Sequence, residues 1–481
     1  MPEINRLLIG GVWVAPESEE RSDIVDSSTE EPIASVSLAG KADMDRAVTA
    51  ARNAFDRGEW RSFSAEQRAV LLDRLGSELG SRCEAIASTV SRENGCSITT
   101  SPTIQAMAAA GTVASAARLA RGLTFEETRT GMMENPVLVV REPVGVAAAI
   151  VPWNVPLTIA MMKMAPALAA GCTVVVKPDP KTALDATYLA ESVVASGFPE
   201  GVVSVVPADR DAAEYLVSHR DVDKVSFTGS TRAGRRVASI CGSDIRRCTL
   251  ELGGKSAAII AEDADIDAVL PQLLPAMTMI NGQACIAQTR VLVPRTRRAA
   301  VTDAIVAAFE ALTVGNALDP DTDIGPLVSQ EQRARVLDYI RIGVEEGATV
   351  ATGGEAADVD GRGYFVQPTL LTDVDRKSTV AQKEIFGPVI CLISYDGIDD
   401  AIDIANDSDY GLSGSVWTRD AEFGLAVARR VRTGTINVNY SVPESVAPFG
   451  GVKASGIGRE SGSEALDAYL EYKSIGVREH A

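Results

Sequence analysis

Between residues 41 and 120, apolar residues recur every three or four positions, as in KADMDRAVTAARNAFDRG and AEQRAVLLDRLGSELGSRCEAIASTVSREN. This spacing places the apolar side chains on one face of a helix, so the region is predicted to be helical. Residues 136–143, PVLVVREP, lack this spacing and are predicted to be extended.

From residue 145 onward, short β-branched or small apolar runs alternate with helical patterns. Strands are predicted at 145–151, 172–178, 201–207 and 224–230. Helices are predicted after each of them: one through Met164 and Leu168, then 182–197, 211–221 and 231–242. Runs of this kind are typical of strands buried on both faces. The alternation of strand and helix predicts a parallel sheet.

The same alternation begins again after residue 254. Strands are predicted at 256–262, 388–395 and 434–440, and helices at 267–282, 297–312 and 399–407. A second α/β domain is therefore expected, with the boundary near Gly253–Gly254. The tail LEYKSIGV, residues 470–477, is strand-like and is expected to pair with residues 136–143 or with a neighbouring subunit.

Residues 144–162 carry no charged side chain and imitate a membrane span. Pro152, Asn154 and Pro156 lie within them, however, and would break a spanning helix and leave polar groups in lipid. A strand, a polar turn and a helix are predicted instead, and no membrane partner is expected. The N-terminus, MPEINRLLIGG, lacks the layout of a signal peptide.

Composition narrows the class of protein. The 481 residues are enough for two or three domains, and 46% hydrophobic with 23% charged residues are globular values. The formal net charge is −19, with 46 Lys and Arg against 65 Asp and Glu. An acidic chain repels phosphate backbones, so no nucleic-acid partner is expected.

Few residue types remain for catalysis. The histidines are His219 and His480, too few for a histidine-based triad or a zinc site, so no metal is expected. Seven widely spaced cysteines without a Cys-x-x-Cys pair fit a reducing compartment, which favours a cytoplasmic location. The chemistry is expected to use cysteine, carboxylate, lysine or a cofactor.

Two motifs suit a phosphate-bearing ligand. FTGSTRAG, residues 227–234, follows a predicted strand and opens a helix, so backbone amides near Gly229 and Ser230 can face a phosphate. It is not GxGxxG, and a dinucleotide site and a plain strand–turn–helix glycine are about equally supported. Lys177 ends a predicted strand in VVVKPDP, where parallel sheets bind ligands, although a solvated lysine before a turn is the simpler interpretation.

Glu251 and Cys285 are the candidates for acid–base and nucleophilic work. Glu251, in ELGGKS, is either a general base whose pKa is lifted by partial burial or an ordinary surface glutamate. Most free cysteines are buried and inert, as Cys172 and Cys391 in their apolar runs are expected to be. Cys285 lies instead among asparagine, glycine and glutamine in INGQACIAQTR, which suggests a loop or helix end where a thiolate is stabilised.

Taken together, these segments resemble the aldehyde dehydrogenase superfamily of the NAD(P)-dependent, non-acylating type. PWNVP, VVVKP, FTGSTRAG, ELGGKS, GQAC, EIFGP and PFGGVKASGIGRE occur in the family's order, and the resemblance runs from about Leu8 to Ile475. The most specific pairing is ELGGKS followed by the cysteine of GQAC.

The resemblance implies an α/β fold with a Rossmann-type cofactor domain, a second α/β catalytic domain and a small β oligomerisation segment. Residues 1–123 and 145–253 would form the cofactor domain, and residues 254–433 the catalytic domain. Residues 124–144 and 434–481 would form the oligomerisation segment and the C-terminal returns. A homodimer or homotetramer is expected.

The resemblance also implies a mechanism. Cys285 resembles the nucleophile that attacks the aldehyde to form a thiohemiacetal, with the oxyanion held by the Asn154 amide and the Cys285 N–H. Hydride transfer to the nicotinamide leaves a thioester, and Glu251 resembles the base that activates water to hydrolyse it to the carboxylic acid. Lys163 and Glu460 match positions that relay protons or orient Glu251.

The same match implies the cofactor contacts. Lys177 and Glu384 would contact the two riboses. The other positions are Gly229 and Ser230 at the pyrophosphate, Phe386 at the nicotinamide ribose and Trp153 on the cofactor wall. Pro180 stands where NAD-preferring members often have a glutamate that binds the adenosine 2′-hydroxyl and repels a 2′-phosphate. NAD use with reduced discrimination against NADP is therefore expected.

The substrate tunnel is expected to be apolar. The positions that should line it are Val155, Met162, Ala284, Ile286, Val442, Val446 and Phe449. No arginine stands ready to pair with a carboxylate, so an uncharged aliphatic, terpenoid or aromatic aldehyde is expected rather than a semialdehyde acid or a betaine-type cation.

Two alternatives stay open. A CoA-acylating aldehyde dehydrogenase would release the thioester to CoA and would not need the glutamate of ELGGKS. A non-catalytic NAD-binding protein of the same fold would usually lack the cysteine or the base, and both are present in this sequence.

Overall fold

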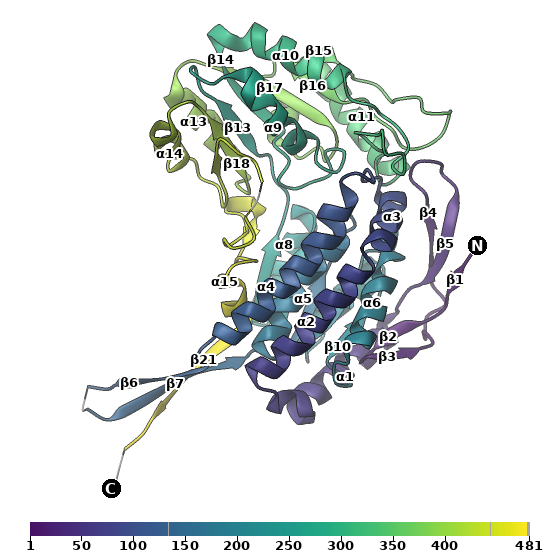
Figure 1. Ribbon diagram of the computed structural model, residues 1–481, viewed down its shortest axis with the longest axis vertical. Coiled ribbons are helices and arrows are strands. Elements are labelled where there is room, and N and C mark those ends of the chain that lie inside the picture. Colours follow the sequence, from purple (N-terminus) through teal and green to yellow (C-terminus); the bar gives the residue numbers. More distant parts are fainter. Residues whose placement is uncertain (133, 443, 479–481) are drawn as a thin grey trace.

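The chain forms two large β-sheets, one above the other in Figure 1, and two sheets of three strands at the edges. The computed structural model describes residues 1–132, 134–442 and 444–478, so His480 lies outside the described residues. The small sheet near the N-terminus has the order β1-β5-β4. Its strands are β1 (Glu3–Ile4), β4 (Arg21–Val25) and β5 (Pro32–Ser37).

The first large sheet has eight strands in the order β20-β12-β11-β8-β9-β10-β2-β3. They are β2 (Leu7–Ile9), β3 (Val12–Val14), β8 (Val146–Ile150), β9 (Thr173–Lys177), β10 (Val203–Val205), β11 (Lys224–Thr228), β12 (Arg247–Glu251) and β20 (Gly456–Ile457). The inner strands from β12 to β10 are parallel, which confirms the prediction for this region. Strand β12 is not among the predicted strands, because its sequence RCTLE has a charged residue at each end rather than an apolar run.

Helices cover both faces of this sheet. One face carries α2 (Ala65–Ser81), α4 (Ala108–Gly122), α5 (Pro156–Ala170) and α6 (Asp185–Ser196), and the other carries α1 (Lys41–Arg57), α7 (Arg210–Ser218) and α8 (Thr231–Ser243). The helical prediction for residues 41–120 is confirmed. Between α2 and α4 it includes α3 (Cys83–Asn94) and a π-helical turn, η2 (Pro102–Met107).

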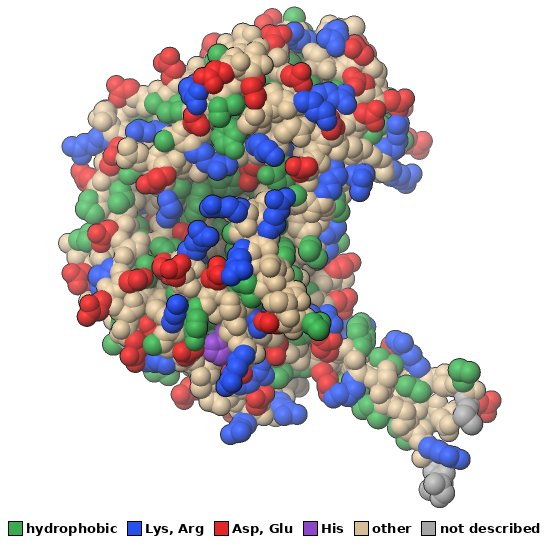
Figure 2. Space-filling view, turned by 180° about the vertical axis from the view of Figure 1, so that it is seen from behind, with side chains coloured by type: hydrophobic (Ala, Val, Ile, Leu, Met, Phe, Trp, Pro, Cys, Tyr) green, Lys and Arg blue, Asp and Glu red, His purple; other side chains and the backbone are tan. Residues whose placement is uncertain are grey.

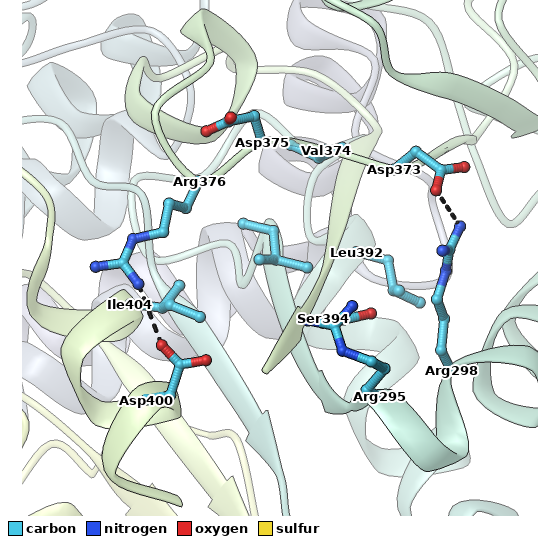
Figure 3. Close-up of a pocket in the computed structure, with 11 residues that line it drawn as sticks. Arg295, Arg298, Asp373, Val374, Asp375, Arg376, Leu392, Ser394, Asp400 and Ile404 are labelled. Atoms are coloured by element: carbon cyan, nitrogen blue, oxygen red, sulfur yellow. Dashed lines mark hydrogen bonds and ion pairs between the residues drawn. The ribbon is translucent and has the colours of Figure 1, made fainter. Parts of the chain in front are cut away.

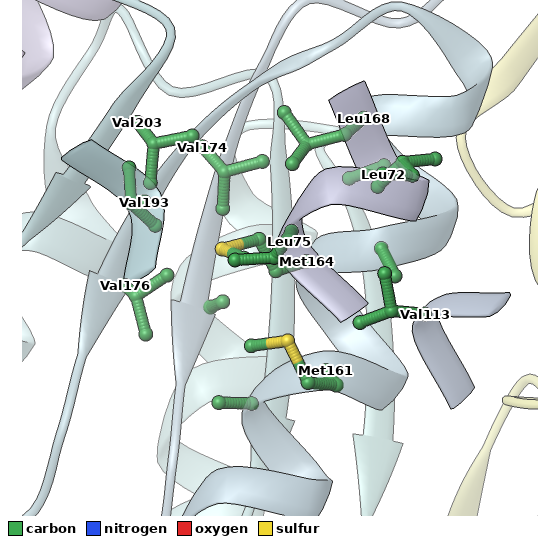
Figure 4. Packing of buried hydrophobic residues seen from close by; sticks show 14 of the residues in the cluster. Leu72, Leu75, Val113, Met161, Met164, Leu168, Val174, Val176, Val193 and Val203 are labelled. Atoms are coloured by element: carbon green, nitrogen blue, oxygen red, sulfur yellow. The ribbon is translucent and has the colours of Figure 1, made fainter. Parts of the chain in front are cut away.

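The stretch at 144–162 that imitates a membrane span consists of β8, a turn and the first part of α5, which confirms the predicted strand, turn and helix. All residues of α5 except Thr158 and Met162 are buried. In Figure 4, side chains of α5 such as Met161 and Met164 pack with those of α2 and β9. A helix that is apolar all round is a core helix, and replacing one buried leucine of this cluster with alanine costs about 2–5 kcal/mol. Within the part of the chain that the structure describes, no helix is long and apolar enough to cross a membrane.

The second large sheet has the order β15-β16-β17-β14-β13-β18-β19, with every pair parallel except β15–β16. Its strands are β13 (Ala257–Ile260), β14 (Arg290–Pro294), β15 (Thr349–Thr352), β16 (Thr369–Thr372), β17 (Val389–Tyr395), β18 (Gly414–Trp417) and β19 (Asn437–Val438). The predictions of β13 and β17 are confirmed. The strand predicted at 434–440 shrinks to the two residues of β19, and the short strands β14, β15, β16 and β18 carry too little periodicity to be predicted.

Helices also sandwich the second sheet. One face packs against α9 (Ile266–Thr278) and α10 (Arg298–Glu310), and the other against α11 (Gln330–Glu345), α12 (Thr379–Gln382), α13 (Ile398–Asn406) and α14 (Ala421–Ala428). The predictions of α9, α10 and α13 are confirmed, although α9 ends at Thr278 and the residues after it form a loop. Helices α11, α12 and α14 are not predicted.

A narrow arm projects from the lower half of the molecule in Figure 1. It consists of β6 (Glu126–Thr130), β7 (Pro136–Pro143) and β21 (Leu470–Gly476). Strand β21 runs antiparallel to β7, with Tyr472 opposite Arg141. The prediction that the tail pairs with residues 136–143 is therefore confirmed.

The chain crosses from the first large sheet to the second between Glu251 and Ala257, and residues 252–256 are buried. This crossing brings the carboxyl end of β12 against the second sheet. On the opposite side from Figure 1, the surface is hollowed between the two halves, and Lys and Arg side chains gather around the hollow (Figure 2).

Candidate active site

A cavity of about 210 Å³ lies where the two large sheets meet. Its walls come from the carboxyl ends of β8, β11 and β12 and from three segments of the second half, which is where parallel sheets bind ligands. The lining residues are Pro152, Trp153, Asn154, Thr228, Gly229, Ser230, Leu252, Gly253, Cys285, Gln332, Arg335, Glu384 and Phe386. Seven of the residues singled out in the sequence thus share one cavity, although they are spread from Trp153 to Phe386 along the chain.

Cys285 lies in the loop between α9 and β14 and is partly exposed at the cavity wall. Its polar neighbours Asn281, Gln283 and Gln288 are buried rather than solvated, because their side chains are hydrogen-bonded inside the protein. Burial of the thiol, with Glu384 and Glu251 nearby, raises the pKa of Cys285 to about 12. The expectation of a stabilised thiolate is therefore wrong for the cofactor-free chain, in which the thiol is the resting form at neutral pH.

Asn154 follows β8 and is buried, with its side chain directed to the loop that carries Cys285. Its Nδ2 donates a hydrogen bond of 2.9 Å to the carbonyl of Gln283. An amide nitrogen carries two hydrogens, so a second donor is left beside the cavity that Asn154 and Cys285 share. This arrangement can stabilise negative charge that develops on an oxygen bonded next to Cys285.

Glu251 ends β12 and is 2% exposed, which excludes the surface-glutamate interpretation. Among the described residues, neither of its carboxylate oxygens has a hydrogen-bond partner. Burial and the nearby Glu460 carboxylate raise the pKa of Glu251 well above its ordinary value, against a smaller opposite effect of Lys163. Glu251 does not line the cavity with Cys285, but its raised pKa makes it a stronger base than an exposed glutamate.

Lys163 and Glu460 form a buried ion pair. Lys163 Nζ lies 2.6 Å from Glu460 Oε1, and the same oxygen accepts a hydrogen bond of 2.8 Å from Ser226 Oγ. Lys163 is on α5, Ser226 is on β11, and Glu460 comes from the last part of the chain. The pair therefore ties three distant segments together next to Glu251.

Trp153 and Phe386 meet edge to face at the cavity, with ring centroids 5.3 Å apart. Phe386 has a φ of 67°, a left-handed conformation that costs a bulky residue about 1–3 kcal/mol. Gln332 Nε2, on α11, donates a hydrogen bond of 2.7 Å to the Phe386 carbonyl and helps to hold this conformation. Strain of this kind concentrates at binding sites.

Glu384 is fixed at the cavity wall by a hydrogen bond of 3.0 Å from the Gly254 amide to its Oε1. Burial raises its pKa to about 7. A side chain at Gly253 would collide with this carboxylate, which explains one glycine of ELGGKS. Gly229 and Ser230 lie at the start of α8, where Ser230 caps the helix by accepting a hydrogen bond from the Ala233 amide.

Lys177 and Pro180 lie outside this lining. Lys177 ends β9, and its burial lowers the pKa of the ammonium group. Pro180 begins the short helix η3 (Pro180–Thr182). The neighbouring Asp179 accepts a hydrogen bond from the Lys181 amide within its own turn, and Lys181 Nζ lies 3.0 Å from Ser329 Oγ. Asp179 is therefore engaged locally.

The candidate substrate residues are distributed unevenly. Ala284 and Ile286 flank Cys285, and Val155 follows Asn154 at the start of α5. Phe449 lies opposite Glu460 in a β-bridge. Met162 lines a separate small cavity, and Val442 and Val446 are 65% and 73% exposed; none of the three lines the cavity with Cys285.

Gln332 and Arg335 are the lining residues that the sequence analysis missed. Both lie on α11, and Arg335 donates a hydrogen bond of 2.8 Å to the Glu384 carbonyl. The buried positions Val336 and Ile340 give α11 an amphipathic pattern that could have identified the helix, but no motif marks its two polar residues.

Another cavity, of about 350 Å³, lies at the second sheet and holds none of the candidate residues (Figure 3). Its arginines are already paired: Arg298 lies 2.6 Å from Asp373, and Arg376 lies 3.1 Å from Asp400. The third arginine of its lining, Arg295, lies 2.8 Å from Asp396, so the cavity offers no unpaired arginine for an anion.

Comparison with known proteins identifies the family. The model of the aldehyde dehydrogenase family matches residues 13–475. Geranial dehydrogenase from Castellaniella defragrans is 46% identical over 469 residues, which cover 98% of each chain. An aldehyde dehydrogenase from Mycobacterium tuberculosis, solved in complex with NAD+, is 44% identical with a TM-score of 0.97 and 99% coverage of both chains.

A mutant of aldehyde dehydrogenase C from Pseudomonas syringae, solved with NAD+ and octanal, is 39% identical with a TM-score of 0.95 and covers 98% of this chain and 96% of its own. These matches confirm the family, the fold and the class of enzyme that the sequence motifs predicted. The chain belongs to the aldehyde dehydrogenase family and is an oxidoreductase that acts on aldehydes.

Proposed function

We propose that this chain oxidises an uncharged, apolar aldehyde to the carboxylic acid with NAD+, through a thiohemiacetal and a thioester on Cys285. The observation that carries the proposal is the single cavity in which Cys285 and Asn154 lie with the turn of Gly229 and Ser230. A nucleophile, an amide donor and a phosphate-type turn thus share one space.

The residues around the cavity fit a nicotinamide dinucleotide. Gly229 and Ser230 precede α8, and a helix N-terminus favours a phosphate group. Glu384 is available for a ribose hydroxyl, and Lys177 stands at the carboxyl edge of the same sheet. NAD+, when bound, accepts the hydride that leaves the substrate carbon. Two of the solved relatives bind NAD+, which supports this cofactor.

Cys285 supplies the sulfur that attacks the aldehyde carbon. Because its resting form is the thiol, the proton has to pass to a base as the carbon–sulfur bond forms. Asn154 Nδ2 and the Cys285 backbone N–H would then hold the oxygen of the adduct. Donors of this kind are each worth about 3–4 kcal/mol in the transition state.

Glu251 would activate the water that hydrolyses the thioester. Its raised pKa makes it a stronger base than an exposed glutamate, and its buried carboxylate oxygens have no hydrogen-bond partner among the described residues, so a bound water would satisfy them. Lys163 and Glu460 would set the charge around this base. The presence of a buried base favours hydrolysis over release to CoA.

An apolar substrate is supported from two sides. Ala284 and Ile286 place apolar groups next to Cys285. The relatives include a geranial dehydrogenase and a structure with octanal, both of which concern apolar aldehydes.

Pro180 in place of a carboxylate supports use of NADP+ beside NAD+.

The division of the chain follows the same proposal. Residues 1–123 and 145–253 would bind the cofactor, and residues 254–433 would carry the nucleophile. Residues 124–144 and 434–481, which include the projecting arm of β6, β7 and β21, would join subunits into a homodimer or homotetramer. The free cysteines support a cytoplasmic location.

The test is a panel of aldehydes assayed by reduced-cofactor absorbance with NAD+ and with NADP+, each with and without CoA. Geranial or octanal should give a higher kcat/KM than succinic semialdehyde or betaine aldehyde, and the product should be the free acid. A charged aldehyde at the top of the panel would overturn the substrate class, and CoA-dependent formation of acyl-CoA would overturn hydrolysis.

A further inference from the structure

Asn94, Asn154 and Gln283 form a closed ring of three hydrogen bonds behind the cavity. Asn94 Nδ2 donates to the Asn154 carbonyl at 2.8 Å, and Asn154 Nδ2 donates to the Gln283 carbonyl at 2.9 Å. Gln283 Nε2 donates to the Asn94 carbonyl at 3.2 Å and closes the ring. In each step a side-chain amide of one residue holds the backbone of the next.

The ring joins three segments that are distant in the sequence. Asn94 is the last residue of α3, Asn154 lies in the turn between β8 and α5, and Gln283 lies two residues before Cys285. Asn94 and Gln283 are fully buried and Asn154 is 4% exposed. Buried polar networks of this kind are costly unless every member is paired, and when paired they hold a single geometry.

The side-chain oxygens of Asn94 and Gln283 are also engaged. Asn94 Oδ1 accepts a hydrogen bond of 3.0 Å from the Cys96 amide, and Gln283 Oε1 accepts one of 2.9 Å from the Val328 amide. These contacts fix which end of each amide is the donor, since exchanging nitrogen and oxygen would break several of them at once. The direction in which each hydrogen bond of the ring is donated is therefore determined.

A second amide supports the same carbonyl. Gln105 Nε2 donates to the Asn154 carbonyl at 3.0 Å, so this oxygen accepts from two buried side chains. Gln105 lies in the π-helical turn η2, and such turns are frequent at functional sites. The irregular turn thus delivers a donor to the peptide of Asn154.

We propose that Asn94 is a positioning residue for aldehyde oxidation, and that Gln105 assists it. The ring uses one hydrogen of Asn154 Nδ2 on the Gln283 carbonyl and thereby directs the other to the oxygen of the adduct on Cys285. The inference rests on the role proposed above for Asn154. Loss of Asn94 removes a donor to the Asn154 peptide, and a displacement of about 1 Å at a reacting centre costs about 100-fold in rate.

The test is a double-mutant cycle that measures the pre-steady-state burst of NADH, which reports formation of the thioester. Asn94→Ala should slow the burst about 10- to 100-fold at saturating NAD+. In an Asn154→Ala background, the same substitution should slow the burst less than about twofold, because Asn94 acts through Asn154. If Asn94 had only a structural role, the effects of Asn94→Ala and Asn154→Ala on the burst rate would multiply.

Tyr395→Phe is the control for lost stability, because it also removes one buried side-chain hydrogen bond to a backbone carbonyl, from Tyr395 to Ile260, far from the ring. It should lower the melting temperature and leave the burst rate unchanged. Gln105→Ala, carried through the same cycle, provides the test if Asn94→Ala does not fold. A full multiplicative effect in the Asn154→Ala background, or an unchanged burst in Asn94→Ala, would overturn the positioning role. An unchanged burst in Asn154→Ala would overturn the oxyanion role of Asn154, and the positioning role with it.

Discussion

Lys163 Nζ lies 2.6 Å from Glu460 Oε1, and the two members of this buried pair act on Glu251 in opposite directions. The Glu460 carboxylate raises the pKa of Glu251, and the Lys163 ammonium lowers it. The balance between them sets the pH at which Glu251 becomes a base. With Glu251 in its proposed role as the base, the pair would tune hydrolysis as well as tie the chain segments together.

The two members should shift the pH profile of kcat in opposite directions. Lys163→Met removes a positive charge that favours the ionised form of Glu251. The pH range over which kcat rises should therefore move to higher pH by about 1 unit. Glu460→Gln removes a repelling carboxylate, so this range moves to lower pH. Each variant leaves one buried charge unpaired and loses about 3–5 kcal/mol of stability.

Lys377→Met is the matched control, because Lys377 pairs with Asp407 at 2.6 Å on the surface, and it should leave the profile in place. Shifts of the same sign in Lys163→Met and Glu460→Gln would contradict the account.

Glu251→Gln should separate the two half-reactions. The first turnover should still give a burst of about one NADH per site, while steady-state turnover falls about 10²- to 10⁴-fold, because the general base is lost. Stopped-flow absorbance measures both. A lost burst with normal hydrolysis of a preformed thioester would place Glu251 in the wrong step.

The same variant should gain stability at alkaline pH. The folded-state pKa of Glu251 lies above the ordinary value of 4.5, so its contribution to stability is complete below that value and is lost as pH rises through the folded-state pKa. Glutamine does not ionise and escapes this loss. The melting temperatures of Glu251→Gln and the parent chain should diverge from pH 5 to pH 9, in favour of the variant.

The rate at which the Cys285 thiol is alkylated should depend on the charge of Glu384. Its pKa of about 12 predicts that alkylation by iodoacetamide, without cofactor, accelerates about tenfold per pH unit between pH 7 and 9. Glu384→Gln removes a carboxylate that raises this pKa and should give faster alkylation at a fixed pH. Mass spectrometry of the Cys285 peptide measures the rate, and Asp396→Asn, at a surface pair with Arg295, is the control. Equal rates for Glu384→Gln and the parent chain would exclude the electrostatic cause.

Cofactor choice should depend on Pro180. The parent chain should prefer NAD+ over NADP+ by less than about 100-fold in kcat/KM, because Pro180 carries no carboxylate and Asp179 is engaged in its own turn. Pro180→Glu should raise the preference for NAD+ about tenfold or more by repelling the 2′-phosphate. A strong NAD+ preference in the parent chain would refute the role of Pro180.

The positions of residues at the ends of parallel strands were the most predictable from the sequence, although Lys177 does not line the cavity. Lys177 ends one apolar run and Gly229 follows another, and both runs are typical of buried strands. The carboxyl ends of parallel strands converge at one edge of a sheet. Glu251 was predicted from its glycine motif even though its own strand was not. For these residues, local sequence and chain topology carry most of the information.

The environment of Cys285 was not predictable in the same way. Its thiol pKa depends on burial and on Glu384 and Glu251, which come from other parts of the chain. Its asparagine and glutamine neighbours look like a solvated loop in the sequence, but they are buried because distant backbone groups pair with them. The hydrogen-bond ring through Asn94 has no local signal at all.

The central claim is that aldehyde oxidation proceeds through the sulfur of Cys285. NADH formation from octanal and NAD+ by Cys285→Ala, compared with the parent chain and with Cys172→Ala as a buried-cysteine control, tests it most directly. Cys285→Ala should form no NADH above background, while Cys172→Ala should remain active. Undiminished NADH formation by Cys285→Ala would contradict the central claim.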